Sequence, residues 1–205
     1  MKKIGRLYVV SPEPVGEIVE KIVMAARCGA DIIQIRSKKM PKKDLSLLVS
    51  YIKTKIPMDK PLIVNDYPDV AISSGADGIH GGRDDFDLKE IKVFKEKYNL
   101  LVGISAYDSL KRGYVAEEYG ADYVAFSSPF PSPSKEKIQT PKEIIEDAAR
   151  TIKIPVFVIG GINDKNIAQM LELGVHGVAV LSYVFLKDTC QRVKKLKGII
   201  ERYAS

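Results

Sequence analysis

An amide and a carboxylate, Asn65 and Asp66, come directly after the short apolar run 62–64. Such a run is typical of a strand buried on both faces of a parallel sheet, and Pro68 discourages its continuation. Ligand chemistry in α/β proteins gathers at the carboxyl ends of such strands. The alternative is that Asn65 and Asp66 only turn the chain and cap the next helix, since both residue types are common there. Whether other strands end in the same way distinguishes the two interpretations.

Two cations follow the apolar run 32–35. Gln34, Arg36 and Lys38 occupy alternate positions, and alternation along a strand predicts that they share one side while Ile35 faces the other. Cations that point into a protein interior are costly unless an anion meets them. The planar guanidinium of Arg and the compact charge of Lys together suit a diphosphate group. The end of this strand therefore predicts an anion site, to which we also assign Lys135.

A second anion site is predicted where two later apolar runs end. Gly160 and Gly161 follow the first of these runs, and Leu181 and Ser182 end the second. Glycines after one strand and a small turn after the next form a backbone-amide phosphate site in parallel barrels.

Two carboxylates, Asp66 and Asp85, are the predicted ligands of a hard divalent cation. Mg²⁺ typically takes one or two carboxylates together with phosphate oxygens and water, so the pair suits a site that also holds a diphosphate. Zinc is not predicted, because His80 and His176 are isolated and no Cys or Glu cluster accompanies them.

Eight apolar strands, each followed by a helical pattern, must position these residues. The alternation predicts the α/β class and a single closed (β/α)8 TIM barrel over residues 1–205, short and with few insertions. An open doubly wound sheet is the alternative, although no Gly-x-Gly-x-x-Gly follows the first strand. The predicted strands are 7–10, 32–35, 62–64, 78–80, 100–104, 123–126, 156–159 and 177–181. The predicted helices are 15–27, 42–55, 70–73, 88–98, 110–119, 140–151, 165–173 and one that reaches the C-terminus.

A tripeptide recurs between these elements. Its copies are Gly29-Ala30-Asp31, Gly75-Ala76-Asp77 and Gly120-Ala121-Asp122, with Gly174-Val175-His176 as a looser fourth. Each follows an amphipathic stretch and precedes an apolar run, which predicts a helix ended by a left-handed glycine and a short loop into a strand. Such loops lie at the end of the barrel opposite the active face, so the repeat predicts stability and not chemistry.

Composition limits the function classes. The 205 residues are 45% hydrophobic and carry a net charge of +6, which fits one globular domain and anionic small substrates. Aromatic residues are not interleaved with the basic run 192–197, so nucleic-acid binding is not expected. No signal peptide or membrane-spanning run is expected. Cys28 and Cys190 form no motif; Cys28 is predicted to be a small buried hydrophobe, and a reducing cytoplasm is the expected location.

Taken together, these segments resemble thiamine-phosphate synthases across nearly the whole chain. The motifs that carry the resemblance follow the strands in the same order: Tyr8-Val9-Val10, Gln34-x-Arg36-x-Lys38, Asn65-Asp66, Gly78-Ile79-His80 with Asp85, Gly103-Ile104-Ser105, Phe130-Pro131-Ser132-x-Ser134-Lys135, Ile159-Gly160-Gly161-Ile162 and Val180-Leu181-Ser182. The resemblance implies a (β/α)8 fold and a Mg²⁺-dependent transferase. Its reaction joins hydroxymethylpyrimidine diphosphate to a thiazole phosphate, releasing diphosphate and giving thiamine phosphate.

The resemblance also implies roles for individual residues. Arg36, Lys38 and Lys135 would neutralise charge on the departing diphosphate, and Asp66 and Asp85 would hold Mg²⁺. The pyrimidine diphosphate would be bound by Gln34, Ile35, Arg36, Ser37, Lys38, Asn65, Ser105 and Lys135. The thiazole phosphate would be bound by Ser132, Pro133, Ser134, Gly161, Leu181 and Ser182. The implied partners are these small phosphorylated substrates, and the sequence does not reveal whether the protein forms an oligomer.

Four segments depart from the family pattern. The family's His-Leu-Gly-Gln, Ser-x-His, Gly-Pro and Thr-x-Thr correspond here to His80-Gly81-Gly82-Arg83, Ser105-Ala106-Tyr107, Ser127-Ser128-Pro129 and Ser132-Pro133-Ser134. Two alternatives follow. One is a thiazole tautomerase paralogue, a role associated with a His at the position of Tyr107. The other is a non-catalytic member that binds the phosphorylated ligand.

Overall fold

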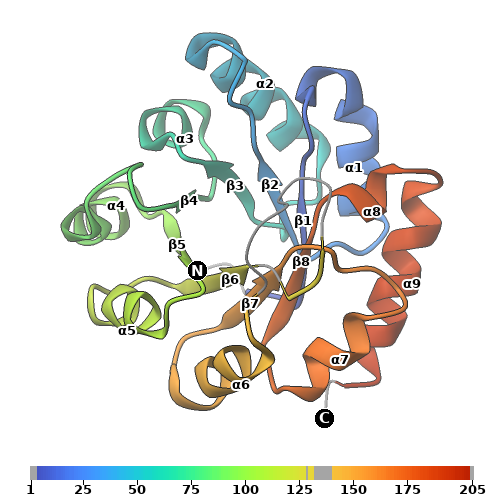
Figure 1. Ribbon diagram of the computed structural model, residues 1–205. Coiled ribbons are helices and arrows are strands. Elements are labelled where there is room, and N and C mark those ends of the chain that lie inside the picture. Colours follow the sequence, from blue (N-terminus) through green and yellow to red (C-terminus); the bar gives the residue numbers. More distant parts are fainter. Residues whose placement is uncertain (1–3, 128, 132–139, 204–205) are drawn as a thin grey trace.

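The protein is a closed barrel of eight parallel strands surrounded by helices (Figure 1). The computed structural model describes residues 4–127, 129–131 and 140–203. The strands are β1 (Leu7–Val10), β2 (Ile32–Ile35), β3 (Leu62–Asn65), β4 (Gly78–Gly81), β5 (Leu101–Tyr107), β6 (Tyr123–Ser127), β7 (Val156–Ile159) and β8 (Gly177–Val180). The α-helices are α1 (Val19–Arg27), α2 (Lys42–Lys55), α3 (Pro68–Ser74), α4 (Ile91–Tyr98), α5 (Leu110–Glu118), α6 (Lys142–Thr151), α7 (Ile167–Glu172), α8 (Ser182–Phe185) and α9 (Thr189–Glu201).

The prediction of a (β/α)8 barrel is confirmed. The strands follow one another around the barrel in sequence order, and β1 pairs with β8 to close it, which excludes the open doubly wound sheet. Two predicted helices begin with a 3-10 turn instead, at η1 (Val15–Ile18) and η2 (Leu88–Glu90). The predicted C-terminal helix is divided into α8 and α9.

Two separate apolar layers hold the barrel together. A small inner layer fills the barrel itself, and three of its rings, those of Tyr8, Tyr123 and Phe157, meet edge to face with centroids 5.5–5.7 Å apart. A much larger outer layer lies between the strands and the helices. Because parallel strands are buried on both faces, nearly every strand residue is apolar, and polar groups appear where the strands end.

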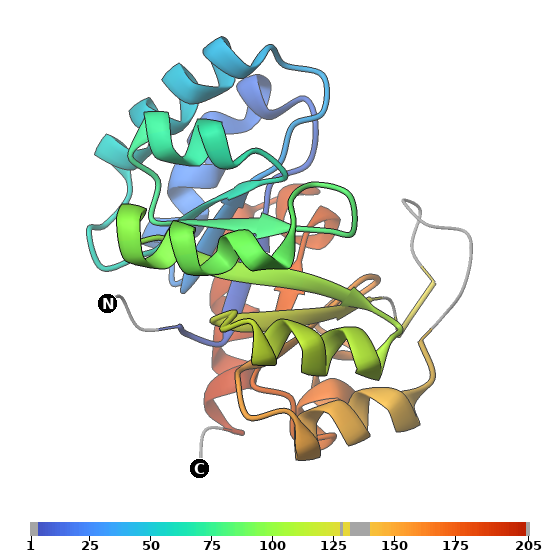
Figure 2. The same cartoon turned by 90° about the vertical axis from the view of Figure 1, so that its left-hand side faces the viewer.

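The glycine repeat ends helices, as predicted. Gly29, Gly75, Gly120 and Gly174 have φ values of 121°, 69°, 85° and 82°, which an L-residue with a side chain adopts only at a cost. The three Asp residues of the repeat each accept a hydrogen bond from the backbone of a strand and pair with a Lys. The strand amides are Leu7, Leu62 and Val102, and the pairs are Asp31–Lys197, Asp77–Lys53 and Asp122–Lys95. Figure 2 shows these helix-to-strand loops at the end of the barrel away from the strand arrowheads.

The prediction for the cysteines is wrong. Cys28 and Cys190 form a disulfide, with their Cα atoms 5.3 Å apart and 162 positions apart in sequence. Closure of the barrel between β1 and β8 brings the end of α1 beside the start of α9. No local sequence motif predicts that contact.

Helices within the described ranges 4–127, 129–131 and 140–203 are all too short or too polar to cross a membrane.

Candidate functional site

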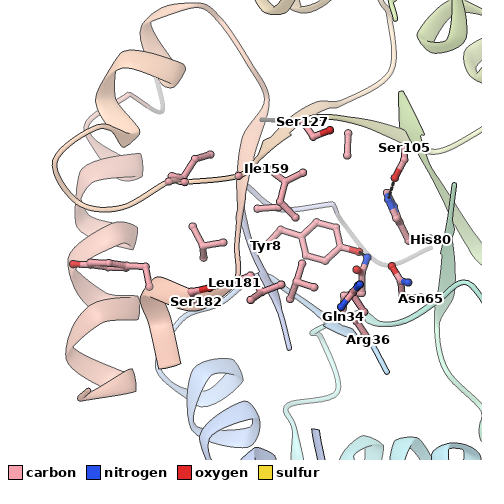
Figure 3. A pocket seen from close by; sticks show the side chains of 18 of the residues that line it. Tyr8, Gln34, Arg36, Asn65, His80, Ser105, Ser127, Ile159, Leu181 and Ser182 are labelled. Carbon is pink, nitrogen blue, oxygen red and sulfur yellow. Dashed lines mark hydrogen bonds between the residues drawn. The ribbon is translucent and has the colours of Figure 1, made fainter. Parts of the chain in front are cut away.

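A cavity of about 470 Å³ opens at the carboxyl ends of the strands. Every strand contributes to its lining, as the barrel prediction requires. Figure 3 shows Gln34, Arg36 and Asn65 together on one side, Leu181 and Ser182 on the other, and the Tyr8 ring between them.

Eight of the predicted site residues line this cavity. They are Gln34, Arg36, Asn65, Ser105, Gly160, Gly161, Leu181 and Ser182. The side chain of Ile35 faces the opposite way, into the outer apolar layer, as alternation predicts. Ser37 is buried and Lys38 is exposed, and neither is among the residues that line the cavity. Ser132, Pro133, Ser134 and Lys135 lie outside the described residues.

The loop that carries the cations is held by the carboxylate of Glu13. One oxygen of Glu13 accepts hydrogen bonds from the Ser37 hydroxyl at 3.0 Å and from the backbone amides of Lys38 and Lys39. These bonds, led by that of the Lys38 amide, lower the pKa of Glu13. Nearby, the Arg36 amide donates to the Ser11 hydroxyl at 2.9 Å. Glu13 therefore fixes the backbone from which the two cations project.

The predicted metal ligands Asp66 and Asp85 meet each other. Burial, followed by a hydrogen bond to Asp85 and the charge of Asp85, raises the pKa of Asp66 to about 6. Asp66 has a left-handed φ of 68° and lies 3.9 Å from Lys38 Nζ. Neither Asn65 nor Asp66 caps α3, whose N-cap is Tyr67 without a side-chain hydrogen bond. The pair therefore turns the chain, with the Tyr67 amide donating to the Asn65 carbonyl at 2.9 Å, but the expectation that it caps the next helix is wrong.

Five polar side chains form a hydrogen-bonded chain beneath the cavity. Gln34 Nε2 donates to the Tyr8 hydroxyl at 2.7 Å, and that hydroxyl lies 2.7 Å from the hydroxyl of Tyr123. His80 connects the chain to the cavity wall, with Nδ1 3.2 Å from the Tyr123 hydroxyl and Nε2 2.9 Å from Ser105 Oγ. Burial raises the pKa of both tyrosines and lowers that of His80 to about 4, so all three are neutral near pH 7.

The opposite wall is made of backbone. Gly160 and Gly161 have φ values of 119° and 64°. A Cβ on Gly161 would lie 2.6 Å from the Pro131 carbonyl oxygen, so only glycine lets these segments approach. Asn166 Nδ2 donates to the Gly161 carbonyl at 2.9 Å and fixes this turn. Gly160, Gly161 and Ser182 all line the cavity, and glycine turns beside a hydroxyl suit a phosphate.

Two of the departures from the family pattern contact each other at the rim. The Arg83 amide donates to the Tyr107 hydroxyl at 3.2 Å, and the Arg83 guanidinium lies 5.6 Å from the centroid of the Tyr107 ring. Arg112 donates to the carbonyls of Ser105 and Gly82, both at 2.7 Å, and so ties the ends of β4 and β5 together. These substitutions form a packed rim and leave the cavity open.

Sequence reasoning gave no role to Glu13, Tyr8, His80 or Tyr123. Glu13 belongs to a Pro-flanked loop far from the cations in sequence, and nothing local reveals its partners. The tyrosines carry a usable signal, because a Tyr inside a strand buried on both faces requires a hydrogen-bond partner for its hydroxyl.

Comparisons with known proteins agree on one family. Residues 7–184 match the family model described as thiamine monophosphate synthase. The thiamine-phosphate synthase of Nitrosospira multiformis is 31% identical over 98% of this chain and 88% of its own, and that of Pyrococcus furiosus is 33% identical over 96% and 95%. The solved structure of a thiamine phosphate pyrophosphorylase from Pyrococcus furiosus superposes with a TM-score of 0.87 at 33% identity, covering 98% of this chain and 97% of that one.

Proposed function

The chain belongs to the thiamine monophosphate synthase family, and from that premise we propose how its own residues carry out the family's transfer reaction. The reaction joins the methylene carbon of a pyrimidine diphosphate to the nitrogen of a thiazole phosphate and releases diphosphate. The observation that carries the proposal is the division of the cavity between a cationic side, formed by Arg36, and a backbone-amide side, formed by Gly160 and Gly161. Two differently phosphorylated substrates require such a division.

Arg36 and Lys38 would meet the diphosphate. Lys38 projects from the loop that Glu13 holds, and Arg36 lies half-buried in the cavity wall. Charge develops on the diphosphate as the bond to carbon breaks, so a fixed cation stabilises the transition state more than the bound substrate. Lys135, the third predicted cation, lies outside the described residues and stays a prediction from the sequence.

Mg²⁺ fits the carboxylate pair of Asp66 and Asp85. Burial, and after it the interaction with Asp85, raises the pKa of Asp66, and a divalent cation would offset both effects. A bound Mg²⁺ would neutralise charge on the diphosphate oxygens.

The tautomerase alternative receives no support from the rim. The position associated with that activity is Tyr107, and its hydroxyl accepts a hydrogen bond from the Arg83 amide while its ring packs against Arg83. A tautomerase reaction also releases no diphosphate, so it would give the carboxylate pair and the cations no leaving group to bind. We include a cytoplasmic location in the proposal, because charged phosphorylated substrates do not cross a membrane unaided.

An assay of purified protein with both phosphorylated substrates and Mg²⁺ tests the proposal. We expect stoichiometric release of diphosphate and formation of thiamine phosphate. Calorimetric binding of both substrates without diphosphate release would instead identify a non-catalytic member of the family. Turnover of a thiazole carboxylate phosphate in the absence of the pyrimidine substrate would identify a tautomerase.

A further inference from the structure

The hydrogen-bonded chain beneath the cavity has a direction, which is set at its Gln34 end. Gln34 Nε2 donates to the Tyr8 oxygen, and the Tyr8 hydroxyl lies 2.7 Å from that of Tyr123, so the Tyr8 hydrogen can point to Tyr123. In this direction Tyr123 would donate to His80 Nδ1, and a neutral ring with its hydrogen on Nε2 would donate to Ser105 Oγ. Since Ser105 Oγ accepts this bond, its own hydrogen is left for the cavity.

Packing holds each link in place. The His80 ring stacks on Tyr123 with centroids 5.6 Å apart and an interplanar angle of 21°. A Cβ on Gly103 would lie 1.9 Å from Tyr123 Cζ, so the missing side chain at Gly103 gives the Tyr123 ring its position. Both tyrosines are nearly completely buried, with 2% and 1% of their surface exposed. The two tyrosine hydroxyls are therefore shielded from water, while the last link, from His80 to Ser105, reaches the cavity.

We propose that His80 is a positioning residue whose tautomer, set through Tyr8 and Tyr123, aims the Ser105 hydroxyl as a donor at an acceptor atom of the bound substrate. The identity of that substrate, an aminopyrimidine diphosphate, rests on the proposed function. Gln34 keeps its amide oxygen as an acceptor at the other end of the chain. A ring that bears an exocyclic amino group and an unprotonated nitrogen has the complementary donor and acceptor pattern.

The tautomer is measurable without any substrate. The chain contains two histidines, so ¹⁵N-histidine labelling yields two rings, and the variant His176→Asn identifies the one from His80. We expect a neutral His80 at pH 7 with its proton on Nε2, and a loss of that preference in Tyr123→Phe, which removes the donor to Nδ1. A proton on Nδ1 in the unchanged protein, or a charged ring at pH 7, would overturn the proposal whether or not the protein is a synthase.

A double-mutant cycle tests the effect on substrate. We expect Tyr123→Phe to raise KM for the pyrimidine diphosphate about ten-fold, the equivalent of one hydrogen bond, with a smaller change in kcat. Because Tyr123 acts through Ser105, the same substitution should have no further effect in a Ser105→Ala background. An equal effect in both backgrounds would show that Tyr123 is only structural and would overturn the proposal.

Two further variants serve as a control and as a substitute. Phe157→Leu alters the same aromatic cluster without touching a hydrogen bond, so it should lower the melting temperature and leave the His80 tautomer unchanged. Tyr8→Phe breaks the chain one link earlier and is measured in the same way if Tyr123→Phe does not fold. Calorimetric affinity for the pyrimidine diphosphate replaces KM if turnover is absent, so a failure of the proposed function is distinguished from a failure of this inference.

Discussion

Asp66 and Asp85 interact beside the ends of β3 and β4, and this interaction, after burial, raises the pKa of Asp66. Asp85 also accepts a hydrogen bond from the Gly82 amide at 2.5 Å, which fixes its orientation toward Asp66. It does not cap the following helical turn, because that cap is Asp87, in a capping box with Glu90. Two carboxylates held this close repel each other when both are ionised, so a divalent cation between them is strongly favoured.

Asp66→Asn and Asp85→Asn should weaken the metal without unfolding the protein. We expect the Mg²⁺ concentration for half-maximal turnover to rise by at least about ten-fold, with partial rescue at high Mg²⁺. Asn tolerates the left-handed backbone at position 66. The exposed neighbour Asp84, changed to Asn, is the control. A lower melting temperature with an unchanged Mg²⁺ requirement would remove Asp85 from the site, and chelation of Mg²⁺ should abolish turnover of the unchanged protein.

Glu13→Gln should loosen the loop that carries the cations. The substitution removes the charge that accepts from the Ser37 hydroxyl and the Lys38 amide. We expect KM for the pyrimidine diphosphate to rise several-fold, with little change in melting temperature because Glu13 lies at the surface. Glu17→Gln, an exposed carboxylate four positions away, is the matched control. If both variants keep the original KM, Glu13 does not position this loop.

His80 should make stability depend on pH. Its folded pKa of about 4 lies below its ordinary value of 6.5, with burial as the main cause. Between pH 6.5 and about 4 the unfolded chain therefore binds a proton at His80 that the folded protein does not bind. The contribution of neutral His80 to the free energy of unfolding is complete above pH 6.5 and is lost as the pH falls toward 4. A lowering of this size corresponds to at most about 3 kcal/mol.

Urea denaturation of the unchanged protein and of His80→Gln, at pH 7 and again near pH 4.5, measures this contribution. The loss of unfolding free energy on acidification should be smaller in the variant. Asp66, whose pKa is raised, acts in the opposite sense but is present in both proteins and cancels in the difference. Identical losses in the two proteins would show that His80 does not carry the effect.

Asp122→Ala should cost stability and leave catalysis intact. Asp122 accepts from the Val102 amide and from Lys95 Nζ, both at 2.7 Å, at the end of the barrel away from the cavity. Its removal leaves the Val102 amide without this acceptor and breaks the ion pair with Lys95, which keeps its hydrogen bond to the Gly120 carbonyl, so we expect a cost of about 2 kcal/mol. Asp147→Ala, which breaks a surface pair with Arg150, should cost less than about 1 kcal/mol. A change in kcat or KM for Asp122→Ala would contradict a purely structural repeat.

The disulfide should contribute to stability without affecting turnover. Cys28 and Cys190 close a loop of 162 residues, and the chain-entropy model gives a stabilisation on the order of 5 kcal/mol for loops of this length. We expect Cys28→Ala, or reduction of the unchanged protein, to lower the melting temperature. Thiol labelling in freshly lysed cells measures how much of the pair is oxidised in the cell. Cytosolic disulfides are rare outside hyperthermophiles, so a pair that stays fully reduced in the cell would show that the disulfide does not stabilise the protein there.

The barrel could be predicted from sequence alone, and so could the strand ends to which we assign the two anion sites. Strand–helix alternation and the glycine repeat are local signals, since each depends on residues within one strand, helix or loop. Parallel strands in a barrel all end on one face, so Arg36 and Gly161 could be assigned to one cavity from their places at strand ends. Neither inference required knowledge of which side chains touch.

The pairings across the barrel became apparent only in the three-dimensional structure. Tyr8 and Tyr123 lie in strands that are apolar on both faces, so no alternation distinguishes the barrel interior from the helix-facing side. Their hydroxyls meet 115 positions apart, and Cys28 reaches Cys190 across 162. Contacts of that separation depend on ring closure between β1 and β8, which fixes the distance between elements that share no local sequence pattern.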